Sequence, residues 1–524
     1  MNTQKLARLG IEASMLLGLA GLCLLTRSAK REEVFSQKGI TFVEPDCYTR
    51  MARVQRLAEH PLQPVRRHDF ENYPIGIRSH TTSLFDYLTL GLSLAFRPIS
   101  DKPLDLAGAC ISPVLGLALM VFLWWWCGLY LNRVSKFFTL ASYAILPAMA
   151  WGQNIGRPDH QSLILLLVTM GIALEACLVR TPGSRAIQIA GGLAWGLALW
   201  TSLFEPLVLL AVALVIQSIL DWRGMLLRRP LWWLCLASVC AVAFAVDGWV
   251  SPRLDLQTLP YLQRWLGEIG ELGHTGPLRF TFWFGGWIWA LPITLFIGCR
   301  YLKLQERPMV LLASLTILLT ALSLWHMRWN SLLAAACCLF AVPLLMSLPG
   351  RLWQPVVWFF LFVPVFVYYV HAFDISNRRP PYSDADLRLI AKNIRSEEGV
   401  LAPWWISPAL LYFSGAPIVA SSSHESIAGT IDAARFFTDP DWRKCREILD
   451  RRKVRWVVTD HPGRVLSQAI RLLGLGHHTE DEAMRIRGLN QTLAYRLHGA
   501  KAVPPMLKLR AAAGDFFLYE YVPE

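Results

Sequence analysis

Charged side chains beside long apolar stretches are the first sign of chemistry in this sequence. They occur in four segments, which contain Asp46 with Tyr48, Arg157 with Asp159 and His160, Glu271, and His326 with Arg328. An ionisable residue at the end of an apolar span is costly and is by default a functional candidate. Carboxylates from separate segments could converge on one hard divalent cation, which prefers oxygen ligands. An arginine beside them could hold a phosphate through two parallel hydrogen bonds, which a lysine cannot do.

The same residues also fit structural roles, and these alternatives stay open at this point. Asp46 fits a solvated loop acid or a helix N-cap, and Asp159 fits a cap for the apolar run that follows it. Glu268 and Glu271 lie in a charged loop, and Arg328 fits a side chain that extends to a membrane interface. The chemical interpretation therefore rests on their shared predicted face and not on any one residue.

The composition indicates that membrane spans are the elements that position these residues. Of 524 residues, 54% are apolar and 17% are charged, whereas soluble domains are nearer a quarter charged. Charged residues make up about one in ten between Leu104 and His371 and about one in four elsewhere. The formal charge of +13 would suggest nucleic acid in a soluble protein. Here basic residues gather in short loops between apolar runs, so topology explains the excess and no nucleic-acid partner is expected.

Hydropathy predicts about eleven spans, since a helix needs about 20 apolar residues to cross a bilayer. The apolar runs are 9–26, 106–131, 134–152, 161–179, 186–203, 206–220, 231–249, 279–299, 308–325, 331–347 and 354–371. With the N-terminus in the cytoplasm, every short inner loop is basic, as the positive-inside rule requires. The first run is followed directly by Arg27, which favours a retained anchor over a cleaved signal peptide. Glu205, in an outer turn, fits either a cavity lining or a wet turn.

The spans imply two domains. Residues 1–372 are predicted to form a polytopic helical membrane domain, with a long first outer loop at 27–105 that includes an interface helix at 84–96. Residues 373–524 are predicted to form an extracytoplasmic α/β domain, because strand-like and helix-like patterns alternate there. The expected strands are 400–402, 418–420, 454–459 and 516–522, and the expected helices are 385–397 and 442–452.

Four segments together resemble a known family. They are DCYTRMAR at 46–53, YPIG at 73–76 leading into HTTSLFD at 80–86, GRPDHQ at 156–161, and PWWIS at 403–407. In this order they look like the first-loop acidic motif, the aromatic-Pro-x-Gly segment with its interface helix, the second acidic motif and the WWDYG block. These are motifs of the catalytic subunit family of oligosaccharyltransferases, in the GT-C class of membrane glycosyltransferases. The chain resembles a divergent bacterial branch of that family.

The resemblance implies a fold, an activity and a set of residue roles. Members move a sugar from a polyprenyl phosphate or diphosphate donor to an acceptor with Mg²⁺ or Mn²⁺ in the site. By resemblance, Asp46 is a metal ligand that meets the acceptor, Asp159 and His160 are further metal ligands, and Glu271, or otherwise Glu268, matches an external-loop glutamate. The remaining assignments are Arg328, His326, Arg157 and Tyr48 for donor binding and Trp404 and Trp405 for the acceptor. Asp46, Asp159 and Arg328 are the expected catalytic residues.

Two departures bear on the acceptor and the metal. Gln161 stands where the classical D-x-E motif has a glutamate, which removes one carboxylate. Ile406-Ser407-Pro408 replaces the Asp-Tyr-Gly of the WWDYG block, which reads the hydroxyl of a glycosylation sequon. This second departure argues against asparagine sequons as the acceptor.

The sequence thus predicts a metal-assisted membrane glycosyltransferase of the bacterial inner membrane, with its C-terminal domain in the periplasm. The expected partners are a lipid-linked sugar donor, membrane lipids, and a protein or cell-envelope glycolipid acceptor. A single-sugar protein or lipid transferase of the same fold, and a non-enzymatic flippase or transporter of lipid-linked sugars, remain as alternatives. A transporter would place its acids near the bilayer midplane.

Overall fold

The computed structural model describes residues 3–36, 39–250, 256–267, 269–286, 288–289, 291–292, 295–296, 306–346, 353–375, 384–486 and 488–523. The chain divides into two compact units, each described here by itself. The helical unit comprises Met1–Val34, Leu106–Gly248 and Glu271–Arg378, and the α/β unit comprises Phe35–Asp105, Trp249–Gly270 and Arg379–Glu524. Most of the first outer loop, from Phe35 to Asp105, therefore packs in the same unit as the C-terminal segment.

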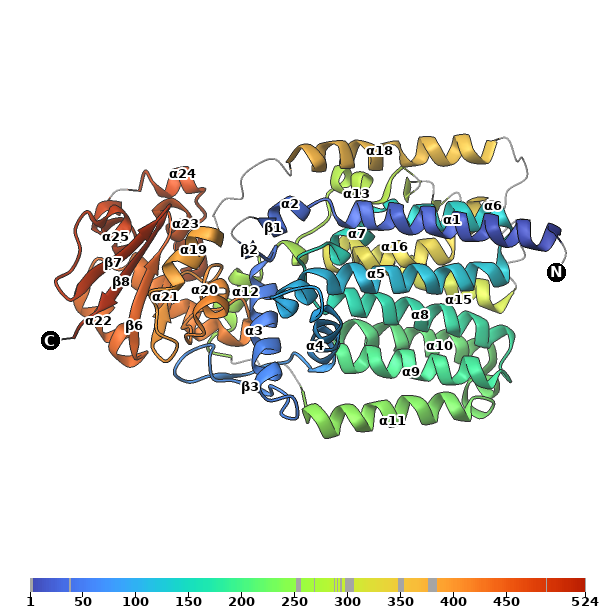
Figure 1. Ribbon diagram of the computed structural model, residues 1–524, viewed down its shortest axis with the longest axis horizontal. Helices are drawn as coiled ribbons and strands as arrows, with labels where there is room; N and C mark the ends of the chain where they lie inside the picture. The colour runs from blue at the N-terminus through green and yellow to red at the C-terminus, as the bar shows by residue number, and fades with distance from the viewer. Residues whose placement is uncertain are drawn as a thin grey trace. The chain divides into compact units, whose positions relative to one another are not determined.

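The helical unit consists of long helices that run side by side (Figure 1). Its first elements are α1 (Thr3–Arg27), α2 (Arg31–Val34), α5 (Pro103–Tyr130), α6 (Arg133–Ile145), α7 (Pro147–Ala150), η1 (Trp151–Gln153), α8 (Gln161–Arg180), α9 (Arg185–Thr201), α10 (Phe204–Leu227) and α11 (Pro230–Asp247). Its later elements are η2 (Gly270–Leu272), α13 (Pro277–Phe284), α15 (Arg307–Trp325), η3 (Met327–Trp329), α16 (Asn330–Leu339), α17 (Ala341–Met346) and α18 (Trp353–Ile375).

Seven helices among the described residues are long and apolar enough to cross a membrane. They include α11, which is apolar all round but buries only 11% of its span against the rest of the protein. Side chains such as Leu234 and Phe244 are 61% and 60% exposed, so lipid is the expected cover for this helix. The total of eleven spans stays a prediction. The run at 134–152 is broken, because Pro147 begins a separate short helix, and α9 has only 17 residues.

The α/β unit contains a four-stranded mixed sheet in the order β5-β6-β8-β7, where β5 (Gly399–Leu401) is parallel to β6 (Val454–Thr459) and the other pairs are antiparallel. Residues of β6 and β8 (Phe516–Tyr521) alternate between two cores. Trp456, Val458 and Leu518 belong to one core, whereas Val457 and Tyr519 belong to the other. Helices must therefore cover both faces of the sheet.

The remaining elements of this unit come from all three of its chain segments. They are β1 (Phe35–Ser36), β2 (Gly39–Ile40), α3 (Pro45–Glu59), β3 (Arg67–His68), β4 (Ile77–Arg78), α4 (Leu84–Phe96), α12 (Leu259–Leu266), α19 (Asp384–Ala391), α20 (Ser407–Ser414), η4 (His424–Ser426), α21 (Ile427–Thr438), α22 (Trp442–Arg451), α23 (Pro462–Leu473), α24 (Glu480–Ala483), η5 (Leu489–Gln491), α25 (Leu493–Leu497), η6 (His498–Ala500) and β7 (Leu507–Ala513). The predicted strand at 418–420 is present only as a bridge between Ile418 and Val400. Strand β7 was not predicted.

A buried ion pair joins the two helices of the first outer segment. Helix α3 packs against α4 and α20 and buries almost every residue from Cys47 to Val54. Within it, Arg53 donates from Nε to Asp86 of α4 at 2.9 Å, and Arg50 donates to the other carboxylate oxygen at 3.1 Å. The Arg53 and Asp86 side chains are 1% and 2% exposed. One buried carboxylate thus pairs with two arginines inside the unit.

We expect Asp86→Ala to destabilise the protein by about 3–5 kcal/mol, because it leaves buried arginine charges without their carboxylate. The matched control is Asp69→Ala, which breaks an ion pair with Arg67 whose side chains are 57% (Arg67) and 80% (Asp69) exposed. That change should cost less than about 1 kcal/mol. Thermal unfolding of the purified protein in detergent measures both, and equal shifts in the two variants would contradict the prediction.

Candidate functional site

The turn that carries Arg157 and Asp159 is fixed by its backbone. It lies between η1 and α8, and Gly156 within it donates its N–H to the carbonyl of Ala109 at 2.9 Å. Gly156 has φ +74°, and a Cβ there would lie 2.3 Å from the side chain of Val34. Only glycine fits this conformation and this space, so the motif presents its charged side chains from a rigid turn.

Arg157 is the centre of the site. Its side chain is 1% exposed, and its guanidinium lies 3.5 Å from the centroid of the Trp151 ring. Nη2 donates to Glu271 Oε1 at 2.8 Å and is 3.9 Å from Asp159 Oδ2. Two carboxylates from segments more than 100 residues apart are therefore held against one guanidinium nitrogen.

The residues that follow Asp159 complete this arrangement. Gln161 donates its amide to Glu271 Oε2 at 3.2 Å, and His160 Nδ1 lies 2.7 Å from Asp159 Oδ1. Helix α8 has no side-chain capping hydrogen bond at its N-cap, His160, and Ser162 bonds the backbone carbonyl of Asp159. The N-cap position of α8 is therefore His160 and not Asp159. The amide of Gln161 supports the charge of Glu271, where a glutamate would oppose it.

The loop that carries Glu271 is anchored to the turn before the predicted donor arginine. His326 Nδ1 bonds the carbonyl of Leu272 at 2.6 Å, and the N–H of Met327 donates to the carbonyl of Gly273 at 3.1 Å. His326 thus orients this loop through its ring. Glu268, the alternative to Glu271, lies outside the described residues.

Arg328 is paired with an acid whose role the sequence left open. Its Nε donates to Glu205, which also accepts from the Ser202 hydroxyl at 2.9 Å. The Glu205 side chain is 3% exposed and that of Arg328 is 28% exposed. Glu271 and Asp159 also interact electrostatically with Arg328. Within the part of the chain that the structure describes, Nη1 and Nη2 of Arg328 form no hydrogen bond, so this edge can receive a ligand.

We call this group the acid–arginine cluster, and it consists of Arg157, Asp159, His160, Gln161, Glu205, Glu271 and Arg328. Sequence analysis identified most of its members but did not identify Gln161 as a partner, and it left Glu205 undecided. An acid at the end of an apolar span was the available signal for Glu205.

Asp46 and Tyr48 belong to the other compact unit. Asp46 lies in the first turn of α3, after Pro45, where the helix dipole favours a negative charge. Tyr48 is 3% exposed, and its hydroxyl donates to Asp384 at 2.5 Å and accepts from the N–H of Phe42 at 3.0 Å. These contacts make Tyr48 part of the core of the α/β unit.

Trp404 and Trp405 line a shallow hollow within the same unit, together with Trp265 and Phe437. Trp404 packs edge-on against Trp265 with ring centroids 5.7 Å apart, and Trp405 donates its indole N–H to Asp460 at 3.1 Å. Ile406, at the position where the WWDYG block has its aspartate, is fully buried in the core. This position therefore offers no polar group to an acceptor.

Comparison with known proteins identifies the fold of the chain. No family profile matches the chain. A curated relative, dolichyl-phosphooligosaccharide-protein glycotransferase 2 of Archaeoglobus fulgidus, is 26% identical over 216 residues, which are 40% of this chain and 34% of that protein. The alignment thus spans about a third of the relative's length.

Two solved structures are similar over almost the whole chain. The archaeal oligosaccharyltransferase AglB of Archaeoglobus fulgidus, in complex with an inhibitory peptide and a dolichol-phosphate, has a TM-score of 0.71 at 12% identity and covers 95% of this chain and 78% of its own. ArnT of Cupriavidus metallidurans, bound to undecaprenyl phosphate, has a TM-score of 0.59 at 11% identity and covers 98% of both chains. The predicted GT-C fold with a C-terminal α/β region is confirmed, and the protein is an integral membrane protein.

The core position of Tyr48 generates a pH-dependence prediction. Burial raises the pKa of its partner Asp384 to about 6, although the Tyr48 hydrogen bond and the charge of Arg388 act in the opposite direction. Between about pH 4 and pH 6, the Asp384 carboxyl is therefore protonated in the folded protein and ionised in the unfolded chain. Stability should fall by about 2–3 kcal/mol as the pH rises from 4 to above 6.

Asp384→Asn imitates the protonated acid, so it should remove this dependence and stabilise the protein at pH 7. Thermal unfolding of the wild type and the variant between pH 4 and pH 7.5 measures the difference. Asp386→Asn, on the same helix, should leave the slope unchanged. Identical slopes for the wild type and Asp384→Asn would contradict the interpretation.

Proposed function

We propose that this protein is a membrane glycosyltransferase that moves a sugar or oligosaccharide from a polyprenyl phosphate or diphosphate donor to an acceptor at the outer face of the membrane. The acid–arginine cluster carries the proposal, because it combines paired carboxylates with an arginine that has an open edge. The named lipid phosphates of the two similar structures support the choice of donor. The bacterial inner membrane, with the N-terminus in the cytoplasm, is the proposed location.

The two arginines have different proposed roles. Arg157 is occupied by Glu271 and Trp151, so its function is to position the Glu271 carboxylate. Arg328 is held at Nε by Glu205 and keeps its two terminal nitrogens for the donor phosphate. A guanidinium in this position stabilises the charge that builds on the leaving phosphate. His326 supports the site by holding the loop of Glu271.

The proposed cofactor is a divalent cation, Mg²⁺ or Mn²⁺, which Asp159, Glu271 and His160 would hold. Asp159 and Glu271 lie against the same guanidinium nitrogen, and His160 lies beside Asp159. When bound, such an ion supplies positive charge to the leaving phosphate. Zinc and sulfate are present in another structure of the Archaeoglobus fulgidus enzyme, which has a TM-score of 0.70 to this chain at 12% identity. Asp46 is proposed as a further ligand and as the residue that meets the acceptor, from its motif alone.

The proposed acceptor is a protein group or an envelope glycolipid that does not present an asparagine sequon. Ile406 is buried and apolar, so its position cannot bond a sequon hydroxyl. Trp404 and Trp405 remain the proposed acceptor-contacting residues, because they line a hollow. Indole rings of this kind offer flat apolar surface to a sugar or a peptide.

Removing the carboxylate of Asp159 or of Glu271 should slow transfer strongly. We expect Asp159→Asn and Glu271→Gln to lower the rate of sugar transfer from a polyprenyl-linked donor with Mn²⁺ by about 100-fold or more. Asp247→Asn is the control, because Asp247 also lies at the end of a span and accepts a hydrogen bond from Trp200 at 2.7 Å. The asparagine keeps that acceptor, so this variant should stay within about threefold of wild type.

Mass spectrometry of products measures transfer and donor hydrolysis. Wild-type rates in Asp159→Asn would overturn the assignment. Translocation of the lipid-linked sugar across vesicles, with no transfer to any acceptor, would favour the flippase instead.

Conservative lysine variants should separate the roles of the two arginines. Arg328→Lys loses two-point phosphate binding, so it should raise the KM for the donor at least about tenfold. Arg157→Lys loosens Glu271, so it should raise the Mn²⁺ concentration needed for half-maximal rate and leave donor KM nearly unchanged. Kinetics over donor and Mn²⁺ concentrations measure both. The reverse pattern would exchange the two assignments.

A further inference from the structure

Two histidines and a glutamate that belong to no site described so far meet in the α/β unit. His80 donates its backbone N–H to Glu425 Oε1 at 2.9 Å, and its ring Nδ1 lies 2.7 Å from the same oxygen. His424 Nδ1 lies 3.5 Å from Glu425 Oε2, and the two imidazole rings have centroids 4.5 Å apart. One ligand atom from each of the three residues lies within 4.8 Å of the others.

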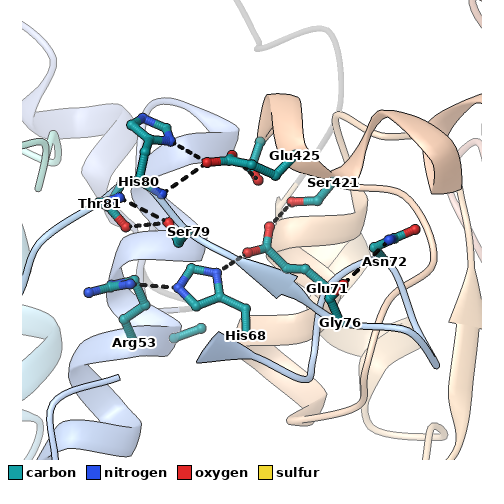
Figure 2. A network of polar contacts seen from close by, with 12 residues as sticks. Arg53, His68, Glu71, Asn72, Gly76, Ser79, His80, Thr81, Ser421 and Glu425 are labelled. Atoms are coloured by element: carbon teal, nitrogen blue, oxygen red, sulfur yellow. Dashed lines mark hydrogen bonds and ion pairs between the residues drawn. The ribbon is translucent and has the colours of Figure 1, made fainter. Parts of the chain in front are cut away.

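The chain segments that carry these residues are tied together by a buried network (Figure 2). His80 follows β4, whereas His424 and Glu425 form η4, which contacts β4. Beneath them, His68 of β3 bonds Glu71, and Glu71 in turn accepts from the hydroxyl of Ser421, three residues before His424. The His68 and Glu71 side chains are 1% and 0% exposed.

This network continues to the ion pair that stabilises the first outer segment. Arg53 Nη1 lies 2.6 Å from His68 Nε2, and Arg53 is held by Asp86. Both backbones that carry the histidine–glutamate cluster are thus fixed by fully buried polar contacts. Partners behind the ligating residues are what keep ligand side chains oriented in protein metal sites.

We infer that His80, His424 and Glu425 form a binding site for a zinc ion. Two imidazole nitrogens and one carboxylate oxygen are a ligand set that zinc accepts, whereas Mg²⁺ and Mn²⁺ prefer oxygen alone. Zinc bonds of about 2.0–2.1 Å in a tetrahedron separate ligand atoms by about 3.3 Å, so small side-chain rotations close the present arrangement. The His80 side chain is 37% exposed, which leaves the fourth position open to water.

The site links distant parts of the chain within one unit. His80 and Glu425 are separated by 345 residues, and a shared ion would join the first outer segment to the C-terminal segment. Zinc binding should therefore stabilise the α/β unit, because an ion that binds only the folded state adds its binding free energy to folding. This stabilisation by zinc does not depend on the proposed catalytic reaction.

The test is zinc retention by the full-length protein in detergent, purified with a tag that contains no histidine. After loading with Zn²⁺ and removal of free ion, elemental analysis should find about one more zinc per chain in the wild type than in His80→Ala or His424→Ala. Micromolar Zn²⁺ should raise the unfolding temperature of the wild type, and this increase should be lost in both variants. Glu425→Gln, which keeps the shape of the side chain, should weaken zinc binding about 10-fold or more.

Two controls keep the result interpretable. His477→Ala removes an exposed histidine elsewhere in the same unit and should retain zinc as the wild type does. Asp159→Asn disables the proposed catalytic cation site and should also retain this zinc, so failure of the catalytic proposal is distinguishable from failure of this one. Equal zinc content and equal thermal shifts in wild type, His80→Ala and His424→Ala would overturn the site. Absence of zinc from the wild type would reduce the cluster to a histidine–glutamate ion pair.

Discussion

Pairing of a buried arginine with a carboxylate is an interaction that recurs in both units. A guanidinium cannot give up its proton, so burying it without an anion costs several kcal/mol. In the helical unit, Arg157 meets this requirement with Glu271, and in the α/β unit, Arg53 meets it with Asp86. Each pair joins segments that are distant in sequence. The same contacts that stabilise the fold therefore bring the candidate side chains of the acid–arginine cluster together.

The departure from the resembled motifs at Gln161 has a partner within the acid–arginine cluster. Gln161 lacks the expected negative charge, but its amide bonds Glu271, which already has Arg157 on its other oxygen. Glu205 supplies an additional acid and holds Arg328. Glu271 and Glu205 thus carry negative charge in the cluster, where Gln161 carries none. Ile406, by contrast, is buried and apolar, so this position carries no polar group in place of the aspartate of the WWDYG block.

Local patterns predicted regular elements well where the physical signal is strong. The helix predicted at 84–96 and the strand predicted at 454–459 have the same bounds as α4 and β6. Both were predictable because the pattern of apolar residues depends only on neighbours in the sequence. Strand β7 was missed because its sequence, LKLRAAA, is mostly exposed and has no clear alternation. The run at 134–152 was read as one span, although Pro147 divides it, because hydropathy does not register a break in helix geometry.

The sequence by itself determined the apolar spans, the α/β region and the four segments in which charge is concentrated, because these depend on composition and short-range spacing. Only the tertiary structure decided which charges are partners. It showed that the hydroxyl of Tyr48 bonds Asp384 in the core of its own unit, that Nε of Arg328 bonds Glu205, and that His80 lies against Glu425. Such pairing depends on the distance between side chains in space and on the cost of leaving a buried charge without a partner. Neither quantity can be calculated from the order of residues along the chain.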